Sequence, residues 1–173
     1  TDGLTAFTSD GFSLGANTTG TQSQELNKNG NTYAAWCWKA GGGQGSANND
    51  GSINTTYTSA NTTAGFSISQ YTANGTSGAT VGHGLGVVPK MIIVKALNTT
   101  DNWEVYHGSL GAEKYLELNR QDAVADSTAI WNDTEPTSSV FSIGDNSGVN
   151  TNGNPYIAYC FAEKTGYSKF GSY

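Results

Sequence analysis

The stretch NPYIAYCFAE, residues 154–163, is nearly repeated earlier in the chain, where residues 31–40 are NTYAAWCWKA. Asn, Tyr, Ala, an aromatic residue, Cys and a second aromatic residue recur in the same order. In an extended strand, successive side chains point to opposite faces. Cys160 then shares one face with Ala158, and the neighbouring aromatic side chains point the other way. This pattern predicts a closely packed β-strand in both places.

The composition favours an all-β domain. Its 173 residues suit one domain and part of a second. The hydrophobic fraction is only 36%, but 19 aromatic residues supply bulky core material. β-Branched and aromatic residues alternate with Gly/Asn clusters, and runs of helix-favouring residues are missing. We therefore expect a jelly-roll-like β-sandwich of about eight short antiparallel strands with at most one short helix.

Turn residues separate the expected strands. The run MIIV at 91–94 predicts a central strand, with Pro89 at its beginning, where a missing N–H is tolerated. In KYLELNR, alternation predicts that Leu116 and Leu118 point inward. Residues 121–130 are the only helical candidate. The strands are expected at 6–14, 32–40, 65–72, 90–96, 103–107, 115–119, 140–143 and 156–163.

The repetition extends beyond the opening pair of segments. GFSLGAN at 11–17 matches VFSIGDN at 140–146, and each precedes a polar loop that ends in Asn-Gly-Asn. GFSISQY at 65–71 likewise resembles GYSKFGSY at 166–173. Diverged tandem repeats show this pattern. We expect residues 1–43 to be the closing strands of a preceding module copy, and residues 44–173 to be one module of a tandem array.

Charge and hydropathy argue against two classes of partner. The net charge is 8 − 14 = −6, and the eight basic residues are scattered, so we expect no nucleic-acid binding. The longest apolar run is far too short to cross a bilayer, so we expect no membrane insertion. The first residues, TDGLTAFTSDGF, lack the basic and apolar regions of a signal peptide.

No motif predicts catalysis, a cofactor or a metal. In GHGLGVVPK, at 82–90, a strand follows the glycines where a dinucleotide site needs a helix, so His83 is interpreted as a hydrogen-bonded structural residue. The oxygen-rich loop 145–154 resembles a calcium loop, but its Asn-Gly turns explain it without a metal. Carboxylate pairs for hydrolysis exist at Glu113/Glu117 and Asp101/Glu104, and solvated turns account for them.

The aromatic residues and cysteines leave two questions open. Cys37 and Cys160 occupy matching positions and are either buried free thiols or a disulfide. Trp36 and Trp38 are expected to be structural residues of the same strand. In the polar run STAIWNDTEPTS, Trp131 is the candidate exposed ring. With Asn132 and Asp133 it forms a candidate glycan-binding cluster, and core burial of the ring is the alternative.

Three longer runs carry a family resemblance. They are GFSISQYTANGTSGATVGHGLGVVPKMIIVK, NWEVYHGSLGAEKYLELN and WNDTEPTSSVFSIGDNSGVNTNGNPYIAYCFAEKTGYSKFGSY. Together they resemble a module of marine bacteriophage tail-fibre-like structural proteins, where it recurs in tandem. The resemblance implies a β-rich virion surface protein, trimeric as phage fibres commonly are, and transfers no catalytic residue.

The expected function is therefore that of a non-enzymatic virion module, in a tail fibre or another appendage, serving as spacer or host-surface adhesin. Its partners would be other virion proteins, copies of itself and, for an adhesin, a host cell-surface glycan. A secreted carbohydrate-binding module is the alternative, and a virion polysaccharide-degrading enzyme is a further one. Paired carboxylates across a cleft would favour the enzyme.

Overall fold

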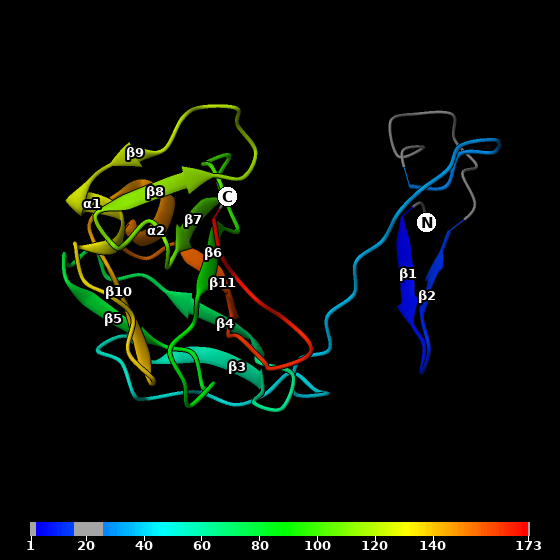
Figure 1. Ribbon diagram of the computed structural model, residues 1–173, viewed down its shortest axis with the longest axis horizontal. Helices are drawn as coiled ribbons and strands as arrows, with labels where there is room; N and C mark the ends of the chain where they lie inside the picture. Colours follow the sequence, from blue (N-terminus) through cyan, green and yellow to red (C-terminus); the bar gives the residue numbers. More distant parts are fainter. Residues whose placement is uncertain (1–2, 16–25, 173) are drawn as a thin grey trace. The chain divides into compact units, whose positions relative to one another are not determined.

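The computed structural model describes residues 3–15 and 26–172 (Figure 1). The chain divides into two compact units, Thr1–Cys37 and Trp38–Tyr173. The division falls inside the repeated segment 31–40. Each unit is described by itself below.

The N-terminal unit contains one β-hairpin. Strands β1 (Leu4–Phe7) and β2 (Phe12–Leu14) pair antiparallel, and the Thr8 N–H donates to the Gly11 carbonyl at the turn. The single strand expected over residues 6–14 is therefore wrong, because a turn divides it. Residues 31–37 have no regular structure, so the strand expected at 32–40 is also wrong. A strand needs a neighbour for its backbone N–H and C=O groups, and none of the described strands pairs with this segment.

The second unit is built around one seven-stranded antiparallel sheet in the order β3-β4-β11-β6-β7-β8-β9. The smaller pair β5 (Ala79–Gly82) and β10 (Val140–Ile143) forms a second sheet. The strands of the large sheet are β3 (Thr55–Asn61), β4 (Phe66–Thr72), β6 (Met91–Ala96), β7 (Glu104–His107), β8 (Lys114–Glu117), β9 (Ala125–Asp126) and β11 (Pro155–Phe161).

Strand β6 is the fourth of the seven and therefore the centre of the sheet, as its apolar run predicts. Pro89 lies two residues before its first residue, Met91, so no sheet hydrogen bond is lost. Strand β11 lies between β4 and β6 and pairs with both without a bulge. Its side chains Tyr156, Ala158 and Cys160 are fully buried, in agreement with the alternation of the sequence.

The core lies between the large sheet, the β5/β10 pair and two four-residue helices, α1 (Thr128–Trp131) and α2 (Ser147–Asn150). Tyr71 of β4 and Tyr156 of β11 stack with their ring centroids 5.4 Å apart. Their hydroxyls donate to the carbonyls of Val149 and Ser147, at 2.7 and 2.6 Å. Buried phenols need such partners, so the two tyrosines fasten α2 to the end of the sheet.

The all-β, sandwich-like fold class is confirmed, and six of the eight expected strands are present as β4, β6, β7, β8, β10 and β11. Strands β3, β5 and β9 were not expected. The Thr/Ser-rich sequence of β3, TTYTSAN, lacks an apolar alternation, and pairing with β4 holds it in the sheet. The helix α1 overlaps only the end of the expected range 121–130.

The prediction that Leu116 and Leu118 point inward is wrong. Leu118 is exposed, and Tyr115 packs against the core instead. The register of β7 and β8 places Leu116 opposite Val105, and neither belongs to the core cluster. Within the described ranges, no helix is long and apolar enough to cross a membrane.

Candidate functional site

Of the two alternatives for Trp131, an exposed sugar-stacking ring and core burial, the structure shows core burial, because the side chain is 2% exposed. Trp131 ends helix α1 and packs edge-to-face against Tyr106 of β7, with ring centroids 6.1 Å apart. Ile130, the preceding residue, is also buried. The apolar pair Ile130–Trp131 therefore anchors the helix in the core, and the ring offers no face to a ligand.

Asn132 and Asp133 shape the turn that follows α1. Both have positive φ, 53° and 46°, which is uncommon for residues other than glycine. The Asn132 N–H donates to the Thr128 carbonyl and closes the helix, and its side-chain oxygen accepts from the Ser77 hydroxyl at 3.2 Å. These contacts give the expected glycan-binding cluster a structural role in the chain.

His83 is a hydrogen-bonded core residue, as predicted. Its Nδ1 accepts from the Leu85 N–H at 3.2 Å, so the ring proton lies on Nε2 and is donated to the Thr137 carbonyl, also at 3.2 Å. Burial lowers the pKa of His83 below its usual value, which favours the neutral ring. The ring joins the loop after β5 to the loop before β10.

The two cysteines are free, which excludes the disulfide alternative for this structure. Cys160 is buried, as expected for a packed strand, and burial raises its pKa to about 12. Cys37 is exposed, so its expected burial is wrong. The difference follows from the local structure, because β11 lies inside a sheet and residues 31–37 lie in none.

A small hollow of about 190 Å³ gathers acidic side chains that are distant in the sequence. Glu104 of β7 lies directly opposite Glu117 of β8 in the antiparallel pair. The hollow therefore combines Asp101 and Glu104 of one expected pair with Glu117 of the other. Glu113 lies outside the hollow and is exposed. The other lining residues are Asp101, Asn102, Tyr115, Ile130, Asn146, Ser147 and Gly148.

Glu104 is the unusual member of this hollow. It is 4% exposed, and its Oε2 is buried without a hydrogen-bond partner. A Cβ at Gly148 would lie 2.5 Å from Oε1, so only glycine leaves room for the carboxyl group. Burial raises the pKa of Glu104, the charges of Glu117 and Asp101 raise it in the same direction, and together they bring it to about 7.

The neighbouring carboxylates already have partners. Glu117 accepts from the Asn102 amide at 2.8 Å and forms an ion pair with Arg120 at 3.0 Å. Asp101 accepts from the Thr99 hydroxyl at 2.7 Å. In the part of the chain that the structure describes, no three His, Cys, Asp or Glu side chains lie where they could hold a metal ion together. The hollow thus provides one uncommitted carboxyl group that takes up a proton near neutral pH.

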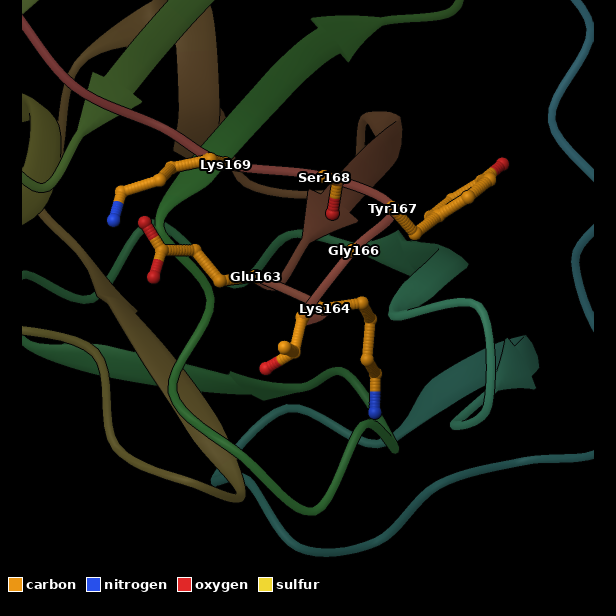
Figure 2. A pocket seen from close by; sticks show the side chains of 7 residues that line it. Glu163, Lys164, Gly166, Tyr167, Ser168 and Lys169 are labelled. Atoms are coloured by element: carbon orange, nitrogen blue, oxygen red, sulfur yellow. The ribbon is translucent and has the colours of Figure 1, made fainter.

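A larger hollow near the C-terminus is formed by consecutive residues, 163–169 (Figure 2). The Lys164 N–H donates to the Ser168 carbonyl at 3.1 Å and closes the loop on itself. Figure 2 shows the side chains of Lys164 and Tyr167 extending in different directions. Binding sites normally combine convergent groups from several elements, so this loop has the geometry of a surface turn.

A family model described as "Domain of unknown function (DUF7483)" matches residues 1–173. The chain belongs to this family. The match includes both compact units of the DUF7483 chain. No curated protein and no solved structure matches it.

In this DUF7483 chain, the segment 31–38 has the largest group of exposed rings. Tyr33, Trp36 and Trp38 are 48%, 77% and 51% exposed. Trp36 therefore lacks the packed structural position that was expected. Within the second unit, Trp38 packs edge-to-face on Phe161 at 5.7 Å and covers only part of its own ring.

Proposed function

We propose that this chain is a non-enzymatic structural module of a bacteriophage appendage, a tail fibre or similar part of the virion surface. It works by assembly with copies of itself, as phage fibres do in trimers, and with other virion proteins. The observation that supports this most is the repetition of sequence. The chain carries one large sheet and, before it, a second set of the segments that form β10 and β11.

Tandem modules of this kind suit an extended extracellular appendage. Each copy contacts only its neighbours, so length is gained by adding copies without redesigning the fold. The sandwich-like fold with polar Gly/Asn turns and a net charge of −6 fits a surface that stays soluble while it is displayed. No nucleic-acid contact, membrane insertion or cofactor belongs to this role.

Between the two roles considered, spacer and host-surface adhesin, the contacts of Trp131 favour the spacer. An adhesin for glycans needs an accessible ring to stack on sugar C–H groups, and Trp131 is in the core. Three of the exposed rings, Tyr33, Trp36 and Trp38, lie together in the repeated segment 31–38, where assembly contacts would explain them. The proposal therefore gives the chain a mechanical rather than a receptor-binding role.

Immunogold labelling of purified phage particles, from a phage that encodes this chain, tests the proposal. Antibodies raised against residues 44–173 should label the tail or another appendage at regular positions. A replication protein encoded by the same genome serves as the control and should give no label. Abundant protein in infected cells together with unlabelled particles would contradict a virion role.

A further inference from the structure

The N-terminal unit reproduces local structure of the second unit, beyond the similarity of sequence. Residues 27–40 and 150–163 are identical at seven of fourteen positions. The Lys28 N–H donates to the Tyr33 hydroxyl at 2.9 Å, and the matching Thr151 N–H donates to the Tyr156 hydroxyl at 2.9 Å. The same five-residue separation and the same atoms recur in both bonds.

Two more hydrogen bonds and one backbone angle agree. The side-chain amides of Asn27 and Asn150 donate to the carbonyls of Gly15 and Gly144. The N–H groups of Asn31 and Asn154 donate to the carbonyls of Lys28 and Thr151. Gly30 and Gly153 have φ angles of 84° and 81°, as these Asn-Gly-Asn turns require. The first unit thus forms the same turn that precedes β11 in the second unit.

The two units differ in what happens after the turn. In the second unit, Pro155–Phe161 lies between β4 and β6 with both edges paired. In the first unit, residues 31–37 follow the same turn but pair with no strand among residues 3–15 and 26–172, and their aromatic side chains are exposed. The segment cannot take the matching position in the sheet of the second unit, because β11 already lies between β4 and β6 there.

We propose that residues 32–38 form the strand equivalent to β11 in a second copy of this module, which precedes the first copy in the same polypeptide and supplies strands equivalent to β4 and β6. This inference deepens the proposed function, because it names the contact through which neighbouring modules are joined. Phe12–Leu14, the match of Phe141–Ile143 in β10, would pair with the β5 of that copy. The backbone groups of residues 32–38 would then bond to the two neighbouring strands of that copy, as in strand addition to an open sheet.

The register assigns a face to each side chain of the segment. Tyr33, Ala35 and Cys37 match Tyr156, Ala158 and Cys160, which are all fully buried in the core. Ala34, Trp36 and Trp38 match the side chains on the opposite face of β11. A one-residue slip would exchange the two faces. Substitutions at the neighbouring Ala34 and Ala35 therefore distinguish this strand pairing from non-specific hydrophobic association.

A tandem protein tests the inference, with residues 44–136 placed directly before residues 8–173. The junction is natural, because TSDGFSLGAN at 8–17 matches TSSVFSIGDN at 137–146 at six of ten positions. Labelling of each thiol by a water-soluble maleimide is followed by peptide mass spectrometry. In the 173-residue chain Cys37 should be labelled rapidly. In the tandem its labelling should slow by about 100-fold or more, because the thiol becomes buried.

Ala35→Glu and Ala34→Glu form a matched pair in the tandem. Ala35→Glu places a charge in the core of the second copy and should restore rapid labelling of Cys37, whereas Ala34→Glu should preserve the protection. Equal labelling of Cys37 in the single chain and the folded tandem would overturn the inference. Equal effects of the two glutamates would also overturn it.

A measurement on the 173-residue chain covers the case in which the tandem does not fold. Ala35→Glu should leave its urea-unfolding curve unchanged, because Ala35 is exposed there, whereas Ala158→Glu should prevent folding, because Ala158 is buried. A large destabilisation by Ala35→Glu would show that the segment is already buried within the 173-residue chain and would refute the inference. Labelling of virions tests the proposed function separately, since a module can belong to a particle without exchanging this strand.

Discussion

Replacing Glu104 by Gln is expected to stabilise the folded module above neutral pH and to have little effect in mild acid. The carboxyl group is 4% exposed, and its Oε2 has no hydrogen-bond partner. Its pKa is about 7 in the folded protein, compared with an ordinary value of 4.5. The folded state therefore holds this proton more tightly than the unfolded state, and the free energy of unfolding decreases as the pH rises through this window.

The magnitude follows from the same pKa difference. Each pKa unit corresponds to about 1.4 kcal/mol, so ionising Glu104 costs the folded state up to about 3 kcal/mol. Gln cannot ionise, but it leaves a buried amide to be satisfied, which reduces the gain to about 2 kcal/mol at pH 8. Below pH 4.5 the glutamic acid is protonated in both states, and the two proteins should differ little.

Urea unfolding of both proteins at pH 4.5, 6 and 8 measures this effect. Glu113→Gln removes an exposed carboxylate outside the hollow and serves as the control, with no expected change in pH dependence. Burial lowers the pKa of His83, but His83 is present in every protein compared, so its contribution cancels. If Glu104→Gln and the wild type have the same free energy of unfolding at all three pH values, the assignment of a buried carboxyl group with a raised pKa is wrong.

Three further substitutions or reactions probe the core and the repeat. Trp131→Ala should lower the free energy of unfolding by about 3–5 kcal/mol in urea, because it opens a core cavity; a loss below 1 kcal/mol would contradict its burial. Tyr156→Phe removes a hydroxyl that bonds Ser147 and Thr151, and should cost about 1–3 kcal/mol by thermal unfolding; an unchanged Tm would show that these bonds contribute nothing. A thiol reagent should modify Cys37 in the native chain and Cys160 only after unfolding, and reaction of both at similar rates would refute the burial of β11.

The fold class and most strands could be predicted because local patterns carried them. The apolar run Met91–Val94 and the alternation in residues 156–161 are direct signals of buried strands, and the sheet places them at and beside its centre. Strand β3 escaped prediction because its Thr and Ser side chains show no apolar face. Its place depends on pairing with β4, which only the assembled sheet supplies.

The candidate sites were harder to predict for a related reason. Trp131 stands in a polar run, so its sequence neighbours indicate exposure, while the short helix α1 turns the ring into the core. The Glu104 hollow depends on the register between β7 and β8, which brings Glu117 opposite Glu104. The signal for this hollow in the sequence is Glu104 itself, a charged residue at the start of the apolar strand EVYH and directly before buried Val105.

The repeated segment showed the opposite behaviour, because residues 31–40 match residues 154–163 in sequence but do not form the expected strand. A sequence pattern records which face of a strand will be buried, but not whether its partner strands are present. Residues 27–31 keep the local hydrogen bonds of their match, since those need only nearby residues. The strand itself depends on long-range pairing, which this chain already gives to β11.

Amide hydrogen exchange of residues 33–38, in the tandem protein and in the 173-residue chain, tests the joining of modules most directly. In the single chain these amides should exchange as fast as those of an unstructured peptide. In the tandem they should become protected to the same order as residues 156–161 of β11, because both segments would lie between two strands. Rapid exchange of residues 33–38 in a tandem whose β11 remains protected would contradict the proposal that this segment completes a neighbouring module.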